Sequence, residues 1–232
     1  MRAIWMVALI LAVGGSTAQE LSGEKILENI ERTLEGVQDY TARLDIIADI
    51  EGMSVPPMKV TMYFKQPDKV HFESDGFALI PREGLAMSLA TLRANFAVDR
   101  VEWDTLHGTH AYRVTLLPRS ERTRTRRVQL LVDPEHWTAE RIVTNTVDGR
   151  SITATFQYVQ VEESWLPSHL DVTFASAQED SSSLPPWEQQ PRTSPGRRVP
   201  LKGTLEIRYS GYRVNTGLSD ELFDSQNRLR ER

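Results

Sequence analysis

The stretch Met58-Lys-Val-Thr-Met-Tyr-Phe-Lys-Gln-Pro-Asp-Lys-Val-His-Phe-Glu73 decides the fold that we predict for this chain. Apolar and polar side chains alternate on both sides of Gln66-Pro67-Asp68, which has the composition of a tight turn. Because successive side chains of a strand point to opposite faces, each arm gives a strand with one apolar and one polar face. The stretch therefore predicts an antiparallel hairpin that buries one face.

The same alternation continues on both sides of this hairpin. Residues 43–50 alternate in the same way, with Leu44 and Ile46 on the apolar side. Later strand patterns are separated by short connections such as the Asp148-Gly149 turn, and short connections favour antiparallel pairing. We therefore expect one meandering antiparallel sheet. Its further strands are predicted at residues 101–106, 110–117, 126–132, 139–147, 151–160, 166–174 and 199–212.

Two segments break this period of two. Residues 23–37 carry apolar side chains at helical spacing, with Ser22 as the expected N-cap and Gly36 near the end. Residues 75–95 are apolar but follow neither period throughout, and proline and glycine interrupt them. We expect a loop there, followed by one or two short helices that lie against the sheet.

The N-terminus has the features of a secretory signal. Arg2 precedes an apolar run, and Ser16-Thr17-Ala18 places small residues where a signal peptidase reads them. The run of about twelve residues is too short to span a bilayer core of about 30 Å as a helix, which disfavours a membrane anchor. We therefore expect a signal peptide at residues 1–18, cleavage near Ala18, and a single periplasmic domain at residues 19–232.

Composition limits the classes of function. The chain has no cysteine, so it forms no disulfide and offers no thiol for lipid attachment, and we expect a soluble monomer. Acidic residues outnumber basic ones, 32 to 27, which argues against nucleic-acid binding. Residues 176–198 are rich in Ser, Pro, Gln, Glu and Arg, so we expect a mobile insertion in which Trp187 is either solvated or a partner contact.

Two motifs resemble those of a known family. Tyr63-Phe64-Lys65-Gln66-Pro67-Asp68-Lys69-Val70 is similar to the aromatic-Lys-x-Pro-x-Lys hairpin of the periplasmic outer-membrane lipoprotein carrier, or lipoprotein-sorting (LolA-like), family. Residues 212–223 resemble that family's closing segment, in which an Asn and a Leu-x-x-x-Phe-like motif pin the C-terminus. The resemblance implies a β-dominated α+β fold: a curved antiparallel half-barrel, that is an incomplete β-barrel, with an N-terminal helix and a short helical lid.

The resemblance also implies a function. Family members hold acyl chains in a cavity between barrel and helices and carry lipoproteins from the inner to the outer membrane. The implied partners are lipid or lipoprotein acyl chains, an inner-membrane donor complex and an outer-membrane acceptor, and no cofactor is implied. The alternative is a regulatory or sensory lipid-binding module on the same scaffold. The family's lid-locking arginine has no assigned position here, since Arg43 is either that residue or an outward-facing strand charge.

The candidate ligand-binding residues are apolar side chains of the first strands and of the predicted lid. Thioether side chains are adaptable and polarizable, so methionines repack around cargo of variable shape. The alternative for each residue is an ordinary packed core. The candidates are Leu44, Ile46, Met58, Val60, Met62, Phe64, Phe72, Phe77, Leu79, Ile80, Met87 and Leu92.

A basic stretch is the candidate docking site. Arg122, Arg124 and Arg126 are predicted to share one strand face, which continues as Val128. They form either a solvated hairpin or a patch that docks acidic lipid headgroups or an acidic partner.

Signals for catalysis are poor. The chain has no Gly-x-Ser-x-Gly elbow and no phosphate-binding glycine loop. His107 and His110 lack a clear third metal ligand, and the adjacent Glu162 and Glu163 of a strand point to opposite faces. We therefore predict a binding protein rather than an enzyme, with no catalytic residue and no metal site.

Overall fold

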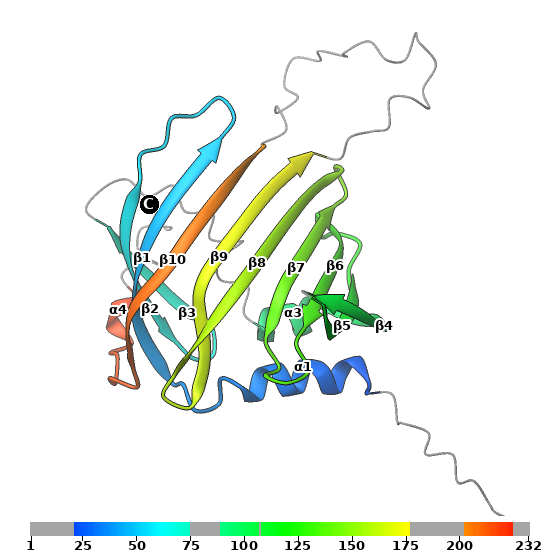
Figure 1. The fold of residues 1–232 in the computed structure, drawn as a ribbon, viewed down its shortest axis with the longest axis horizontal. Coiled ribbons are helices and arrows are strands. Elements are labelled where there is room, and N and C mark those ends of the chain that lie inside the picture. The colour runs from blue at the N-terminus through cyan, green and yellow to red at the C-terminus, as the bar shows by residue number, and fades with distance from the viewer. Residues whose placement is uncertain (1–20, 75–88, 107, 177–201, 225–232) are drawn as a thin grey trace, which may run out of the picture.

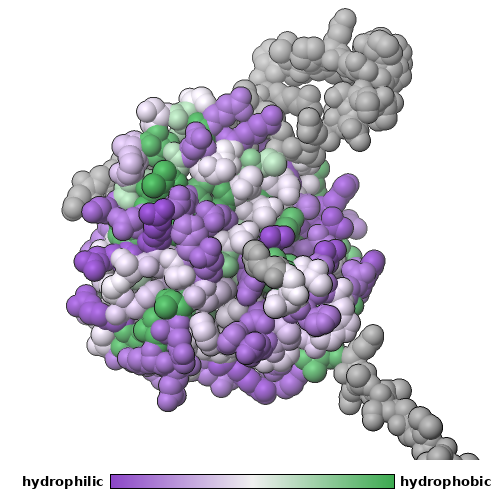
Figure 2. Space-filling view, viewed as in Figure 1, coloured by the Kyte–Doolittle hydropathy of each residue, from purple (hydrophilic) through white to green (hydrophobic). Residues whose placement is uncertain are grey.

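Ten strands form one antiparallel sheet that curves around its inner face (Figure 1). The computed structural model describes residues 21–74, 89–106, 108–176 and 202–224. The predicted signal peptide and nearly all of the predicted insertion at 176–198 lie outside these residues. The face drawn in Figure 2 carries mostly hydrophilic side chains, with smaller apolar patches between them.

The elements follow one another mainly as hairpins. Within the described residues, the helices are α1 (Gly23–Arg32), α3 (Leu89–Asn95) and α4 (Glu221–Asp224). The strands are β1 (Asp39–Ile50), β2 (Met58–Lys65), β3 (Lys69–Ser74), β4 (Phe96–Leu106), β5 (Thr109–Pro118), β6 (Thr125–Val132), β7 (Ala139–Thr146), β8 (Arg150–Val161), β9 (Ser164–Ser176) and β10 (Gly203–Val214).

The sheet is a barrel that stays open between two consecutive strands. Its order is β3-β2-β1-β10-β9-β8-β7-β6-β5-β4, so the first and last strands of the chain pair with each other. The two edges are therefore β3 and β4, which follow one another in sequence. This arrangement confirms the predicted antiparallel half-barrel.

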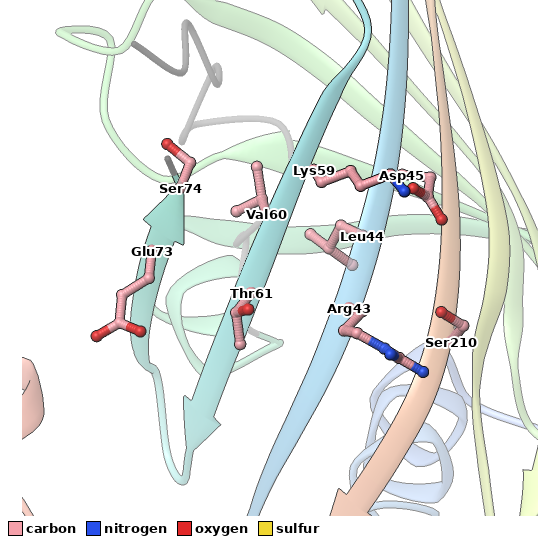
Figure 3. A pocket seen from close by; sticks show the side chains of 9 residues that line it. All are labelled: Arg43, Leu44, Asp45, Lys59, Val60, Thr61, Glu73, Ser74 and Ser210. Carbon is pink, nitrogen blue, oxygen red and sulfur yellow. The ribbon is translucent and has the colours of Figure 1, made fainter. Parts of the chain in front are cut away.

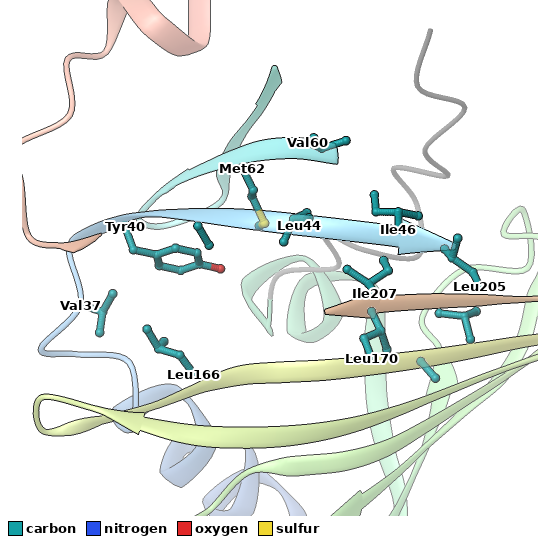
Figure 4. Close-up of a cluster of buried hydrophobic side chains, with 13 residues drawn as sticks. Val37, Tyr40, Leu44, Ile46, Val60, Met62, Leu166, Leu170, Leu205 and Ile207 are labelled. Carbon is teal, nitrogen blue, oxygen red and sulfur yellow. The ribbon is translucent and has the colours of Figure 1, made fainter. Parts of the chain in front are cut away.

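Two clusters of buried side chains line the inner face. The first cluster lies on β1, β2, β8, β9 and β10, and Figure 4 shows its side chains pointing toward one another from these strands. Its buried members are Val37, Tyr40, Ala42, Leu44, Ile46, Val60, Met62, Ala154, Leu166, Leu170, Val172, Leu205 and Ile207. The second cluster joins α1 and α3 to β4, β5 and β6. Its buried members are Ile26, Leu27, Leu92, Phe96, Val114, Leu116, Val128, Leu130 and Val132.

Helix α1 is shorter than the sequence predicts. Ser22 is the N-cap, as expected, and its hydroxyl accepts a 3.3 Å hydrogen bond from a backbone N–H of the first turn. The helix ends at Arg32 instead of near Gly36. The following turn brings Val37 into the first cluster, so tertiary packing overrides the helical pattern.

Strand β4 begins five residues earlier than predicted, at Phe96 directly after α3. A β-bulge lies between Val98 and Arg100, where the pairing register with β5 shifts. The extra residue, Asp99, breaks the alternation of inward and outward side chains. The period of two is therefore absent from this part of the sequence, although α3 itself agrees with the short helix expected within residues 75–95.

The start of β1 and the segment that follows β10 meet around one buried carboxylate. Asp39, only 3% exposed, accepts hydrogen bonds from the backbone N–H groups of Thr216 (2.8 Å), Gly217 (3.0 Å) and Leu218 (3.2 Å). The Thr216 hydroxyl donates a further bond of 3.2 Å. Burial raises the pKa of a carboxyl, but these donors outweigh it, so the pKa of Asp39 lies below its ordinary value.

Asn215 completes this closing junction, which comprises residues 34–39, 65–69 and 215–220. Its backbone has φ of 55°, a conformation that asparagine tolerates. Its side-chain oxygen accepts from the backbone N–H of Gln38, and its amide donates to the Gly36 carbonyl, both at 2.8 Å. The asparagine thus pins the C-terminal segment, as the family resemblance implies.

The turn of the Lys-Gln-Pro-Asp-Lys hairpin contributes further hydrogen bonds and ion pairs to the closing junction. The Gln66 amide donates to the carbonyl oxygens of Leu34 (2.6 Å) and Val37 (2.8 Å). Lys65 lies 2.7 Å from a carboxylate oxygen of Asp220, and Lys69 lies 3.1 Å from the same oxygen. The two motifs that carry the family resemblance are therefore bound together in space.

We predict that Asp39→Asn lowers the free energy of unfolding by about 2 kcal/mol, because a buried charged acceptor with several donors is lost. Asp45→Asn, an exposed position on the same strand, is the control and should change it by less than about 0.5 kcal/mol. Urea denaturation measures both. Equal effects of the two substitutions would contradict the role given to Asp39.

The same carboxylate predicts a pH dependence. A folded-state pKa below the unfolded value of about 3.9 contributes stability above that pH, and the contribution is lost as the pH falls through the folded-state pKa. The wild-type stability should therefore fall more steeply below about pH 4 than that of Asp39→Asn. If the free energy of unfolding fell equally steeply in wild type and in Asp39→Asn between pH 5 and pH 2.5, the lowered pKa of Asp39 would be contradicted.

Candidate ligand-binding face

The inner face of β1 and its neighbours is a continuous apolar surface. Leu44 lies opposite Val60 of β2, and Ile46 lies between Met58 of β2 and Ile207 of β10. Leu44 and Ile46 are each only 1% exposed. Alternation along β1 therefore points one set of side chains into the half-barrel and the other to its convex face.

Most of the predicted ligand-binding residues that the structure describes share this face. Leu44, Ile46, Val60 and Met62 belong to the first cluster, and Met58, Phe64 and Phe72 are half-buried against it. Leu92 is different, because it packs in the second cluster beneath α1. The remaining candidates, Phe77, Leu79, Ile80 and Met87, lie outside the described residues.

Later strands contribute residues that were not among the candidates. Leu205 and Ile207 of β10 are buried beside β1, and Leu170 of β9 is buried beside Ile207. Alternation indicates that Leu205 and Ile207 face inward, but it does not reveal that β10 lies next to β1. This pairing joins residues about 160 positions apart, so no local pattern reports it.

Aromatic rings line one end of the apolar face. Tyr40 stacks on Phe64 with ring centroids 4.9 Å apart and meets Tyr212 edge-on at 5.5 Å. The Tyr212 hydroxyl donates a 2.5 Å hydrogen bond to the Pro167 carbonyl. Burial raises the pKa of Tyr40 and Tyr212 above the ordinary tyrosine value, so both phenols stay neutral at physiological pH. This end of the face is apolar in bulk but carries neutral hydroxyl groups.

A pocket of about 640 Å³ lies on the convex face of the sheet rather than on the inner face. Leu44 and Val60 contribute to its lining, but most of the lining residues are polar (Figure 3): Arg43, Asp45, Lys59, Thr61, Glu73, Ser74 and Ser210. It is not the apolar cavity that the family resemblance implies.

Arg43 is an outward-facing strand residue. Its guanidinium lies over Gly211 of β10, where an added Cβ would come within 2.9 Å of the Arg43 side chain. Gly211 has φ of 62°, and Gly211 and Tyr212 together oppose Ala42, which forms a β-bulge. The structure thus places Arg43 against the neighbouring strand on the convex face (Figure 3).

We predict that Gly211→Ala lowers the free energy of unfolding by about 1–2 kcal/mol, because alanine is strained at positive φ and meets Arg43. When Gly211→Ala is combined with Arg43→Ala, the part of this loss in stability that comes from contact with the Arg43 side chain should be recovered. The part that comes from alanine at positive φ should remain. Thermal denaturation of the two variants measures the difference. A wild-type melting temperature for Gly211→Ala would refute the assignment of strain.

The basic stretch differs from its predicted geometry. Strand β6 begins at Thr125, so Arg122 and Arg124 lie in the preceding turn, and only Arg126 belongs to the strand. A register shift between Thr125 and Arg127 also displaces Arg126 from the alternation that leads to Val128. The arginines are exposed, but they do not form one strand face.

Other polar candidates have structural surroundings. His110 packs edge-on against Trp103, and Glu162, with φ of 55°, occupies the tight turn between β8 and β9. Within the described ranges, no group of three His, Asp or Glu side chains is arranged to hold a metal ion. No helix in that part of the chain combines the length and apolar character needed to cross a bilayer.

Comparison with known proteins gives matches in fold. No family model matches the chain, and no curated protein matches it in sequence. A domain assigned to outer membrane lipoprotein sorting, from Vibrio parahaemolyticus, has a TM-score of 0.60 and 12% identity, over 88% of this chain and 96% of that one. A DUF1329 family protein from Desulfovibrio piger has a TM-score of 0.57 and 13% identity, over 88% and 98%.

A third solved structure is similar as well. A LolA superfamily protein from Nitrosomonas europaea has a TM-score of 0.52 and 10% identity, over 86% of this chain and 96% of that one. At these identities the likeness shows the fold. The chain therefore has the half-barrel fold of lipoprotein-sorting and LolA superfamily proteins.

Proposed function

We propose that this chain is a periplasmic carrier that binds lipid or lipoprotein acyl chains on the inner face of its half-barrel and moves them toward the outer membrane. The observation that supports this most is the composition of the first cluster. It contains side chains of the strands and of the turn before β1, and among the described residues none from α1, α3 or α4. An apolar strand face that no described helix covers is suited to a hydrocarbon chain.

Helices α1 and α3 pack on another part of the inner face. Ile26 and Leu27 of α1 and Leu92 of α3 pack in the second cluster over β4, β5 and β6. The half-barrel is thus divided into a helix-covered part and a part in which β1 and β2 face β8 and β9. We place the acyl chain in the second of these parts, where Met58, Met62 and Phe72 lie near the open β3 edge.

Energies of transfer make such a carrier workable without an energy source. Burial of one methylene contributes roughly 0.8 kcal/mol, so a chain of about fifteen methylenes gains about 12 kcal/mol in an apolar site. A bilayer offers the chain about the same. Transfer is therefore near balance, and small changes in side-chain packing at the mouth of the site decide whether the chain is loaded or released.

The fold comparisons support the choice of cargo. The similar proteins include one assigned to outer membrane lipoprotein sorting. By analogy, we propose that a donor complex in the inner membrane loads this chain and an acceptor at the outer membrane unloads it. The proposal includes export by the N-terminal signal, cleavage near Ala18, and a monomeric carrier that acts by non-covalent binding.

Phe72→Asp should weaken the binding of a fluorescent fatty acid at least tenfold, because it places a charge on the inner face at the β3 edge. Phe72 is half-buried, so the fold is expected to tolerate the change. Ile47→Asp is the matched control, since Ile47 is 48% exposed on the opposite face of β1. Circular dichroism verifies that both variants are folded.

Native mass spectrometry of protein purified from its own periplasm tests the cargo directly. The expected result is a protein mass increased by an acylated lipid or lipoprotein. Purely unliganded protein that also takes up no fatty acid would exclude the carrier function. Cross-linking in the periplasm that captures a transmembrane regulator instead of lipoproteins would assign the scaffold to a sensor.

A further inference from the structure

One rim of the sheet is strongly basic in a chain that is acidic overall. Residues 119–127 contain five arginines and one glutamate, whereas the whole chain has a formal charge of −5. They form the β5–β6 turn and the first residues of β6. We call Arg119, Arg122, Arg124, Arg126 and Arg127 the arginine rim.

The charges of this rim are not neutralised by neighbours in the described part of the chain. Arg122, Arg124, Arg126 and Arg127 are exposed and take part in none of the ion pairs there. Arginines elsewhere on the sheet do have partners: Arg100 pairs with Glu102, and Arg208 with Glu206. The rim therefore presents a concentrated positive field to solvent.

Exposed apolar side chains adjoin the rim. Val147, 60% exposed, lies in the β7–β8 turn, and its backbone N–H donates a 2.9 Å hydrogen bond to the carbonyl of Arg124. Leu117, 41% exposed, lies one residue beyond the last paired residues of β5 and β6, Leu116 and Val128. Two hairpin tips are thus joined into one surface that combines arginines with exposed aliphatic groups.

We propose that the arginine rim docks on the surface of a bilayer that contains anionic phospholipid. Guanidinium groups bind phosphate oxygens in a bidentate manner, and aliphatic side chains beside them enter the interfacial layer. An acidic protein would match the charges alone. A bilayer also matches the exposed Val147 of the β7–β8 turn and the exposed Leu117 near the end of β5, because a planar interface accepts them without a preformed pocket.

The overall charge of the chain determines which surface of the molecule faces the bilayer. Because the rest of the molecule is acidic, an anionic bilayer repels most of its surface and attracts the rim. The inference goes beyond the proposed function, since docking involves the ends of β5–β8 and does not depend on whether the inner face holds an acyl chain.

Sedimentation with vesicles tests the docking. The full chain should sediment with phosphatidylcholine vesicles that contain phosphatidylglycerol and not with pure phosphatidylcholine, and sodium chloride should reduce the binding. Arg122→Glu with Arg124→Glu should lower the partition coefficient about 25-fold or more, which corresponds to about 1 kcal/mol for each arginine lost. Val147→Ser should lower it by a smaller factor without any change in charge.

Arg100→Glu with Arg208→Glu is the matched control, because it changes the net charge equally at exposed sites away from the rim. The proposal would be overturned if the wild-type chain did not bind these vesicles. It would also be overturned if the two double variants lost binding equally. Capture of an acidic protein by the rim, without sedimentation on vesicles, would overturn it as well. Fatty-acid binding by Arg122→Glu with Arg124→Glu should be unchanged, so failure of docking is distinct from failure of the carrier function.

Discussion

The closing junction around Asp39 is the constraint on which the rest of this structure depends. The buried carboxylate of Asp39 accepts hydrogen bonds from backbone N–H groups of a segment about 177 residues further along the chain. The Asn215 side chain forms hydrogen bonds with the turn before β1. Closing so long a loop costs conformational entropy that grows with its length. The charged hydrogen bonds at the junction offset part of this cost and bring β1 beside β10.

Once β1 and β10 are paired, the position of the opening follows. The meander runs from β4 to β10, continues through β1 to β3, and leaves its two edges at strands that are neighbours in sequence. Helices α1 and α3 pack near β4, whereas the inner face near β1 and β2 meets the strands of the opposite wall. One junction thus divides the half-barrel into a part that helices α1 and α3 cover and a part in which strands of opposite walls face each other, and the proposed acyl-chain site is in the second part.

The two proposed surfaces have different physical characters. The inner face is apolar and buried, with neutral tyrosine hydroxyls at one end, so it favours hydrocarbon without selecting a charge. The arginine rim is polar, exposed and selective for anions, and its attraction acts over a distance that salt limits to about 10 Å at 0.1 M. A protein that exchanges acyl chains with bilayers needs both, since the first binds the chain and the second orients the molecule toward its source.

The sequence by itself determined the local structure: the hairpin at residues 58–73, the N-cap at Ser22 and the inward side of each alternating strand. These features depend on neighbouring side chains and on the two-residue period of a strand. Only the tertiary structure decided the end of α1, the start of β4 at Phe96, the bulge within β4, and the separation of Leu92 from the other candidates. Residues 39–42 are all buried, so burial does not alternate along this part of β1. The physical reason is that bulges, register and the β1–β10 contact depend on partners far away in sequence, which no local period can report.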